Sequence, residues 1–117
     1  MRRDDDLIRE LLLEYEGSDE WLHLIPGMYQ AAPPEERRKQ YHVLLLIDEG
    51  LAVQVGDGTF RLTSQGHDYI DAIRSDNVWK KTKDAASIVG GAGLSVLREL
   101  AVAYLKEEVG NRLGITL

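Results

Sequence analysis

The segment EERRKQYH (residues 35–42) gathers side chains suited to binding an anionic polymer. Arginine makes bidentate hydrogen bonds to guanine and to phosphate, and its neighbours can add single polar contacts. Two residues of a predicted hairpin, Thr59 and Arg61, are placed to touch a DNA backbone. The residues predicted to contact DNA are therefore Arg37, Arg38, Lys39, Gln40, Tyr41, Thr59 and Arg61.

The same segment has a second interpretation as a solvated helix start. Glu35 and Glu36 neutralise part of its positive charge, and most charge runs simply face water. The predicted hairpin turn contributes Asp57 and no lysine or arginine, so it would repel a phosphate. A second basic cluster, WKKTK (residues 79–83), is expected to bury Trp79 and to leave its lysines in water.

No residue pattern supports catalysis. His23, His42 and His67 lack the spacing of metal ligands, and the chain contains no cysteine. His42 lies beside the predicted core face of its helix and is expected to be packed or partly exposed. The GGAG run at residues 90–93 lacks the lysine and the serine or threonine of a phosphate loop. We therefore expect no enzyme activity, no cofactor and no metal.

Three consecutive acids, Asp4, Asp5 and Asp6, have two interpretations. They have the chemistry of a metal site, or they mark the first turn of a helix. The second is favoured because negative charge at a helix N-terminus is stabilised by the helix dipole.

Length and charge set further bounds. The 117 residues correspond to one ordinary domain. No apolar run reaches about 18 residues, so no membrane span is expected. The N-terminus has no apolar core behind its arginines, so we expect no secretory signal and a cytoplasmic location.

The net charge is −6. Such a chain is repelled by nucleic acid at long range, so DNA binding would need a local basic patch.

Hydrophobic spacing predicts the elements that position these residues. Up to the hairpin they are a helix (4–16), a short extended segment (21–25), a helix (35–49) stopped by Gly50, and strands 53–55 and 60–62 joined by the turn GDGT. Three helices follow. Thr63 or Ser64 is expected to cap the first and Asp76 or Asn77 the second, and GGAG separates the second from a last helix at 94–109.

This order of helix, short strand, helix, hairpin and helices is that of a winged helix. The predicted fold is mainly α with a small β-hairpin (α+β), and one helix of such a fold lies in the DNA major groove while the hairpin forms the wing. We expect a winged helix-turn-helix core at residues 1–75 and a C-terminal helical extension at 76–117.

Several motifs resemble those of bacterial winged helix-turn-helix regulators. Their recognition helix typically ends in Leu-x-x-x-Gly-Leu, and their wing leads into Leu-Thr-x-x-Gly. The matching residues here are Leu46 or Ile47 with Gly50 and Leu51, and Leu62 and Thr63 with Gly66.

The sequence is also similar, over nearly the whole chain, to a bacterial and phage family called domain of unknown function 2513. The most specific part of this similarity is the segment GHDYIDAIRSDNVW. That resemblance implies a winged-helix fold and an origin in prophages or mobile elements, and it implies no activity.

The segment YHVLLLIDEG (residues 41–50) places leucine or isoleucine on nearly every side of its helix. Gln40, Val43, Leu46 and Ile47 are expected to face the core. A helix that is apolar all round is usually buried all round, so the C-terminal helices or a second copy should cover its other face. The last helix either forms a two-fold contact between copies or packs on the first helix of its own chain. The residues assigned to packing or to a homodimer contact are Leu44, Leu45, Leu97, Leu100, Tyr104 and Leu105.

Two functions follow from these observations. The first is a small DNA-binding regulator of transcription, of prophage or mobile-element origin. The second is an acidic interaction module that binds or inhibits a host nucleic-acid-binding complex, such as a defence complex. Its acidic face would consist of Asp4, Asp5, Asp6, Glu10 and Glu14.

Overall fold

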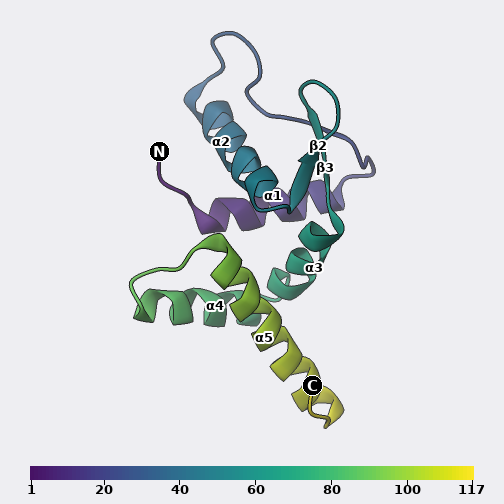
Figure 1. Ribbon diagram of the computed structural model, residues 1–117, viewed down its shortest axis with the longest axis vertical. Coiled ribbons are helices and arrows are strands. Elements are labelled where there is room, and N and C mark those ends of the chain that lie inside the picture. The colour runs from purple at the N-terminus through teal and green to yellow at the C-terminus, as the bar shows by residue number, and fades with distance from the viewer. The chain divides into compact units, whose positions relative to one another are not determined.

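The computed structural model describes all 117 residues, Met1–Leu117. The chain forms two compact units, residues 1–67 and 68–117. Its elements follow the order α1, β1, α2, β2, β3, α3, α4 and α5 (Figure 1). This confirms the predicted order of helix, strand, helix, hairpin and three helices. The fold is mainly helical with a small antiparallel sheet, as the α+β prediction stated.

Helix α1 (Asp5–Gly17) confirms the interpretation of the acidic triplet as a helix start. Asp4 is the N-cap, and its carboxylate accepts hydrogen bonds from the backbone N–H groups of Asp6 and Leu7. Such a cap satisfies donors that the first helical turn leaves unpaired. The buried residues of α1 recur at the predicted spacing and are Leu7, Ile8, Leu11 and Leu12.

Helix α2 (Pro34–Asp48) begins with a proline, as the sequence indicated, and packs against α1. Gly50 follows its end with a φ of 71°. Val43 and Leu46 are fully buried, which confirms the predicted core face. His42 is also 0% exposed, whereas Gln40 and Ile47, which were predicted to face the core, are only half-buried. The buried face of α2 is therefore centred closer to His42 than the sequence predicted.

The sheet has the strand order β1-β3-β2 and both pairings are antiparallel. Its strands are β1 (His23–Leu24), β2 (Ala52–Gln54) and β3 (Thr59–Leu62). Phe60 and Leu62 of β3 are buried, whereas Arg61 between them is exposed. Figure 1 shows α2 and the β2–β3 hairpin leading away from α1 next to one another, and α2 contacts β2.

The Gly-Leu motif before the hairpin and the Leu-Thr-x-x-Gly motif after it contact each other through hydrogen bonds. The backbone N–H of Thr63 donates to the Leu51 carbonyl over 3.0 Å. The Thr63 hydroxyl donates to the Gly50 carbonyl over 2.5 Å and accepts from the Gly66 N–H over 3.0 Å. A Cβ at Gly66 would lie 2.1 Å from the Leu51 carbonyl oxygen, so only glycine fits here. The motif therefore fixes the start of α3 (Ser64–Ile73) against the end of the preceding loop.

The C-terminal unit contains α4 (Asp76–Ile88) and α5 (Leu94–Leu113), which pack on each other. The prediction that Asp76 or Asn77 caps α4 is wrong. Ser75 is the N-cap, because it is extended and its hydroxyl accepts from the Val78 N–H, whereas Asp76 is already helical. Helix α5 also continues past the predicted end at residue 109 and ends at Leu113. It includes Gly110, because a single glycine inside a helix costs only about 1 kcal/mol of stability.

The second basic cluster behaves as predicted. Trp79 is buried, while Lys80, Lys81 and Lys83 are exposed. Lys80 pairs with Asp84 over 3.2 Å, and the Lys83 ammonium lies 5.8 Å from the centre of the Trp79 ring. No helix in the chain is both long enough and apolar enough to cross a membrane.

Candidate nucleic-acid interface

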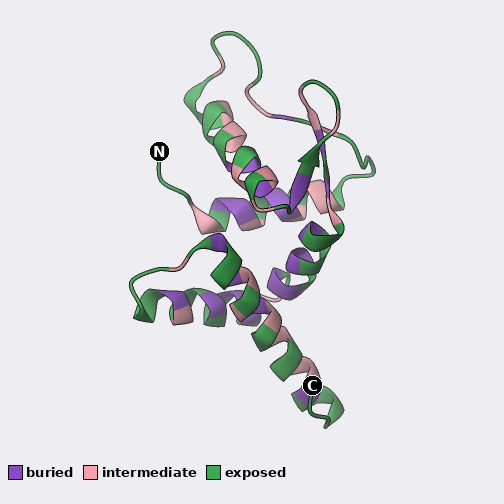
Figure 2. Cartoon of the chain, in the orientation of Figure 1, coloured by how far each residue is buried: buried purple, intermediate pink, exposed green.

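The face of α2 that points away from the core carries three of the predicted DNA-contacting residues, Arg37, Arg38 and Tyr41. Arg37, Tyr41, Leu44 and Asp48 are exposed and recur at spacings of three and four residues, so they form one stripe, and the exposed Arg38 lies beside it. Figure 2 shows that the first turns of this helix carry exposed and half-buried residues and that buried ones appear only in its C-terminal half. Tyr41 and Leu44 are 38% and 42% exposed, so cover for this face by the C-terminal helices or by a second copy stays a prediction.

The three cations of this segment differ in what they contact. The Arg38 guanidinium forms an ion pair with the Asp4 carboxylate, which holds the start of α1. The Lys39 ammonium lies 3.8 Å from a Glu36 oxygen. Arg37 is exposed and forms no ion pair. The local positive charge that is free to meet DNA is therefore smaller than the sequence suggests.

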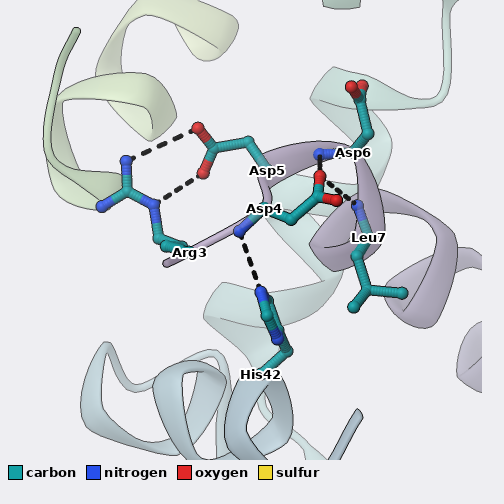
Figure 3. A network of polar contacts seen from close by, with 6 residues as sticks. All are labelled: Arg3, Asp4, Asp5, Asp6, Leu7 and His42. Atoms are coloured by element: carbon teal, nitrogen blue, oxygen red, sulfur yellow. Dashed lines mark hydrogen bonds and ion pairs between the residues drawn. The ribbon is translucent and has the colours of Figure 1, made fainter. Parts of the chain in front are cut away.

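A buried histidine ties α2 to the first turn of α1 (Figure 3). The backbone N–H of Asp4 donates to Nε2 of His42 over 2.8 Å, and Nδ1 of His42 lies 2.8 Å from the Arg38 carbonyl oxygen. A backbone N–H can only donate and a carbonyl can only accept. His42 is therefore the neutral tautomer that carries its proton on Nδ1.

Hydrogen bonding also sets the charge of Asp4. The hydrogen bond from the Leu7 N–H, together with the Arg38 guanidinium and the Asp6 N–H, lowers the pKa of the Asp4 carboxyl below its usual 3.8, against a smaller effect of burial. Asp4 thus stays ionised at neutral pH. It acts as a helix cap and as the anchor of Arg38.

The predicted acidic interaction face is divided by these contacts. Asp4 is committed to the cap, and Asp5 accepts from Nε of Arg3 over 2.7 Å. Asp6, Glu10 and Glu14 are exposed and recur every four residues along α1, so they form an acidic stripe. No group of three or more histidine, cysteine, aspartate or glutamate side chains is arranged to hold a metal ion.

The hairpin residues of the predicted interface take different roles. The Thr59 hydroxyl donates to the Val55 carbonyl and so closes the turn within the hairpin. Arg61 is exposed on the outer face of β3, although its Nη1 donates to the Leu62 carbonyl over 3.1 Å. The cleft that Arg61 lines has a volume of about 330 Å³ and also contains Trp21 and His67, but no residue of α2. This cleft therefore includes Arg61 but not Arg37.

Tyr15 of α1, His23 of β1 and Phe60 of β3 form an aromatic cluster. The rings of Tyr15 and Phe60 meet edge to face with centroids 4.9 Å apart, and His23 lies 4.9 Å from Tyr15 and 5.4 Å from Phe60. Burial lowers the pKa of His23 below its usual 6.5, although Glu20 acts in the opposite direction. Burial also raises the pKa of Tyr15, and the charges of Glu14 and Glu36 add to this effect.

The sequence prediction missed the surface that follows α1, because it treated residues 21–25 as an extended segment and residues 28–36 as a loop. Ile25 of this segment is buried, but its other large apolar side chains are exposed and are Trp21, Leu22, Leu24, Met28 and Tyr29. The indication in the sequence was the Pro-Gly pair at residues 26–27. A strand that ends so soon can turn few of its apolar residues toward the core.

The packing residues assigned to α5 are buried to different degrees. Leu97 is 1% exposed, so it is already packed and offers no open surface to a second copy. Leu100, Tyr104 and Leu105 are half-buried. A two-fold contact through these three residues stays a prediction.

Comparison with known proteins gives a family and one relative. Residues 2–92 match the model of the family described as "Hypothetical protein (DUF2513)". A Haemophilus influenzae protein described as "Uncharacterized protein" is 34% identical over 92 residues, which cover 71% of this chain and 76% of the relative. No solved structure matches the chain significantly.

Proposed function

Given that the chain belongs to the DUF2513 family, we propose that it is a small winged-helix DNA-binding protein that regulates transcription. In this proposal α2 enters the major groove and the β2–β3 hairpin is the wing. The observation that carries it is the exposed stripe of α2, where Arg37 and Tyr41 face away from the core. The hairpin that follows α2 and the β1-β3-β2 sheet are also those expected of a winged helix.

The chain departs from a helix-turn-helix in one respect. Turns and irregular backbone occupy residues 25–33, where a first helix would precede the reading helix. The contacts of Asp4 with His42 and Arg38 supply another means of holding α2, because they fasten it to α1. A reading helix has to be fixed in orientation if its side chains are to meet base edges in register.

The charge of the protein predicts weak and salt-sensitive binding. With a net charge of −6, long-range attraction to DNA is absent, so affinity depends on a few local contacts. Each phosphate neutralised contributes about −0.9 to the slope of log K against log salt. Arg37→Ala should therefore make this slope shallower by about one unit if Arg37 meets a phosphate.

The test is a selection of random duplex DNA on the purified protein at low and near-physiological salt. We compare the wild type with Arg37→Glu and with Lys106→Glu, a matched charge reversal at an exposed site on α5. Arg38 is left intact because it holds Asp4. The wild type and Lys106→Glu should enrich the same motif, and Arg37→Glu should not. Absence of enrichment at both salt concentrations, or enrichment unchanged by Arg37→Glu, would contradict the proposal.

A second candidate function is an interaction module for a basic protein, such as a host nucleic-acid-binding complex that the protein would inhibit. The observation that favours it is the acidic stripe of Asp6, Glu10 and Glu14 on α1, which attracts a cationic partner. Pull-down from a bacterial lysate at low salt should recover a basic protein and lose it at high salt. Recovery of nothing at low salt would count against this function.

A further inference from the structure

A groove in the N-terminal unit has the composition of a peptide-binding site. It has a volume of about 620 Å³, within the range of roughly 300–1,000 Å³ typical of ligand sites. One wall is formed by Leu24 of β1 and by the segment that follows β1, including Met28 and Tyr29. The other walls are the second half of α1, the first turns of α2 and the hairpin turn.

Backbone contacts fix the walls of this groove. The Ile25 N–H donates to the Gly58 carbonyl over 2.8 Å, which fastens the segment after β1 to the hairpin turn. Gly27 adopts a φ of 72° and lies so near α2 that a Cβ would be 2.7 Å from the Glu36 carbonyl oxygen. The groove is thus formed before any partner arrives, and a partner need not spend binding energy on ordering it.

The groove is both apolar and negatively charged. Leu24, Met28 and Tyr29 are 78%, 55% and 59% exposed, which leaves much apolar surface in contact with water. The lining carries three carboxylates and one ammonium, a formal charge of −3 + 1 = −2. These charged residues are Glu14, Glu36, Asp57 and Lys39. The ammonium of Lys39 lies near Glu36, so the other two acids have no cation beside them in the groove.

This combination selects the chemistry of the occupant. A phosphate backbone or an anionic lipid would be repelled by the carboxylates. Arginine and lysine have aliphatic stems that cover apolar surface while the charged head reaches an acid. A guanidinium can also stack on a tyrosine ring. An extended peptide with a basic residue next to an apolar one satisfies every part of the lining.

We propose that this groove binds a segment of a partner protein in which arginine or lysine adjoins a large apolar residue. The cation would lie between Glu14 and Asp57, and the apolar side chain would cover Met28 and Tyr29. This proposal deepens the second candidate function and rests on it, because it gives the basic partner a defined site. It does not depend on DNA binding by α2.

The experiment is selection from a displayed library of random peptides on the full-length protein, followed by titration of the enriched peptide. Asp57→Lys changes the groove at an exposed turn between two glycines, and Tyr29→Ala removes an exposed ring. Glu99→Lys, at an exposed site on α5, is the matched control, and Glu10→Lys tests the part of the acidic stripe of α1 that does not line the groove. Circular dichroism verifies that each variant is folded.

The wild type should enrich peptides that pair a basic with an apolar residue. Asp57→Lys and Tyr29→Ala should weaken binding of the selected peptide at least tenfold. Glu99→Lys should bind it as the wild type does, and Glu10→Lys should weaken it less than Asp57→Lys does. Loss of binding in Glu10→Lys alone would move the partner to the acidic stripe, overturning the groove while keeping the second function. Absence of basic peptides among those enriched would overturn both the groove as a binding site and the second candidate function. Dimerisation of the wild type that Asp57→Lys abolishes would identify a second copy as the occupant and overturn the proposal.

Discussion

The backbone N–H of Asp4 donates to Nε2 of His42 over 2.8 Å, so the first turn of α1 is fastened to the middle of α2. The two residues are 38 positions apart in the chain. His42 is fully buried and its other nitrogen bonds to the Arg38 carbonyl. One side chain therefore satisfies a backbone donor of one helix and a backbone acceptor of the other.

Replacement of this histidine should be costly. His42→Phe keeps an aromatic ring in the core but removes both hydrogen bonds, and a polar group left unpaired in the interior costs about 1–3 kcal/mol. We expect the free energy of unfolding in urea to fall by about 2 kcal/mol or more. The control, His67→Phe, changes an exposed residue and should alter it by less than about 0.5 kcal/mol. If the two substitutions lowered the free energy of unfolding equally, the hydrogen bonds of His42 would not be the cause of the loss.

Asp4 should make the protein sensitive to acid. Its pKa is lower in the folded state than the usual 3.8, so its carboxylate stabilises the fold above that pH and loses this effect as the pH falls through the folded pKa. Asp4→Asn keeps a side-chain oxygen for the cap and removes the charge. The difference in unfolding free energy between wild type and Asp4→Asn should be largest at neutral pH and shrink below pH 3.8. A difference that stays constant with pH would contradict this prediction.

His23 should add a second dependence on pH, in a different window. Its pKa is lowered by burial in the cluster with Tyr15 and Phe60, so the unfolded chain takes up a proton before the folded one does. Stability should be complete above the usual value of 6.5 and decrease as the pH falls from there toward the folded pKa. The NMR titration of the His23 ring should have its midpoint below 6.5, and His23→Gln should remove this part of the pH dependence. A midpoint at or above 6.5 would contradict this prediction.

Gly66 should tolerate no side chain. Gly66→Ala places a Cβ 2.1 Å from the Leu51 carbonyl oxygen, so the backbone has to shift and the contacts made by Thr63 are strained. Forcing an extra carbon into packed structure costs about 1–3 kcal/mol, and this overlap with backbone belongs at the upper end. Thermal unfolding measures the effect. Gly17→Ala is the matched control, because a Cβ there meets nothing within 4 Å, and its melting temperature should be near that of the wild type.

Local patterns in the sequence determined the elements. The leucine spacing of α1, the turn residues Gly56–Gly58 and the Thr63 cap act over a few residues, and the structure places a helix, a hairpin and a helix start there. The cap of α4 was misassigned because Ser75 and Asp76 are both good capping residues. The choice between them depends on which one keeps an extended backbone.

Only the tertiary structure decided how the charged residues are used. Arg37 and Arg38 are neighbours of the same type, yet α1 supplies a carboxylate to Arg38 and none to Arg37, because 100° of helical rotation separates them. The groove likewise combines Glu14, Tyr29 and Asp57, which come from three elements. The sequence by itself thus determined the helices, the hairpin and the Thr63 cap, since these depend on neighbouring residues. Packing between distant segments decided which charges are paired and which surfaces stay open.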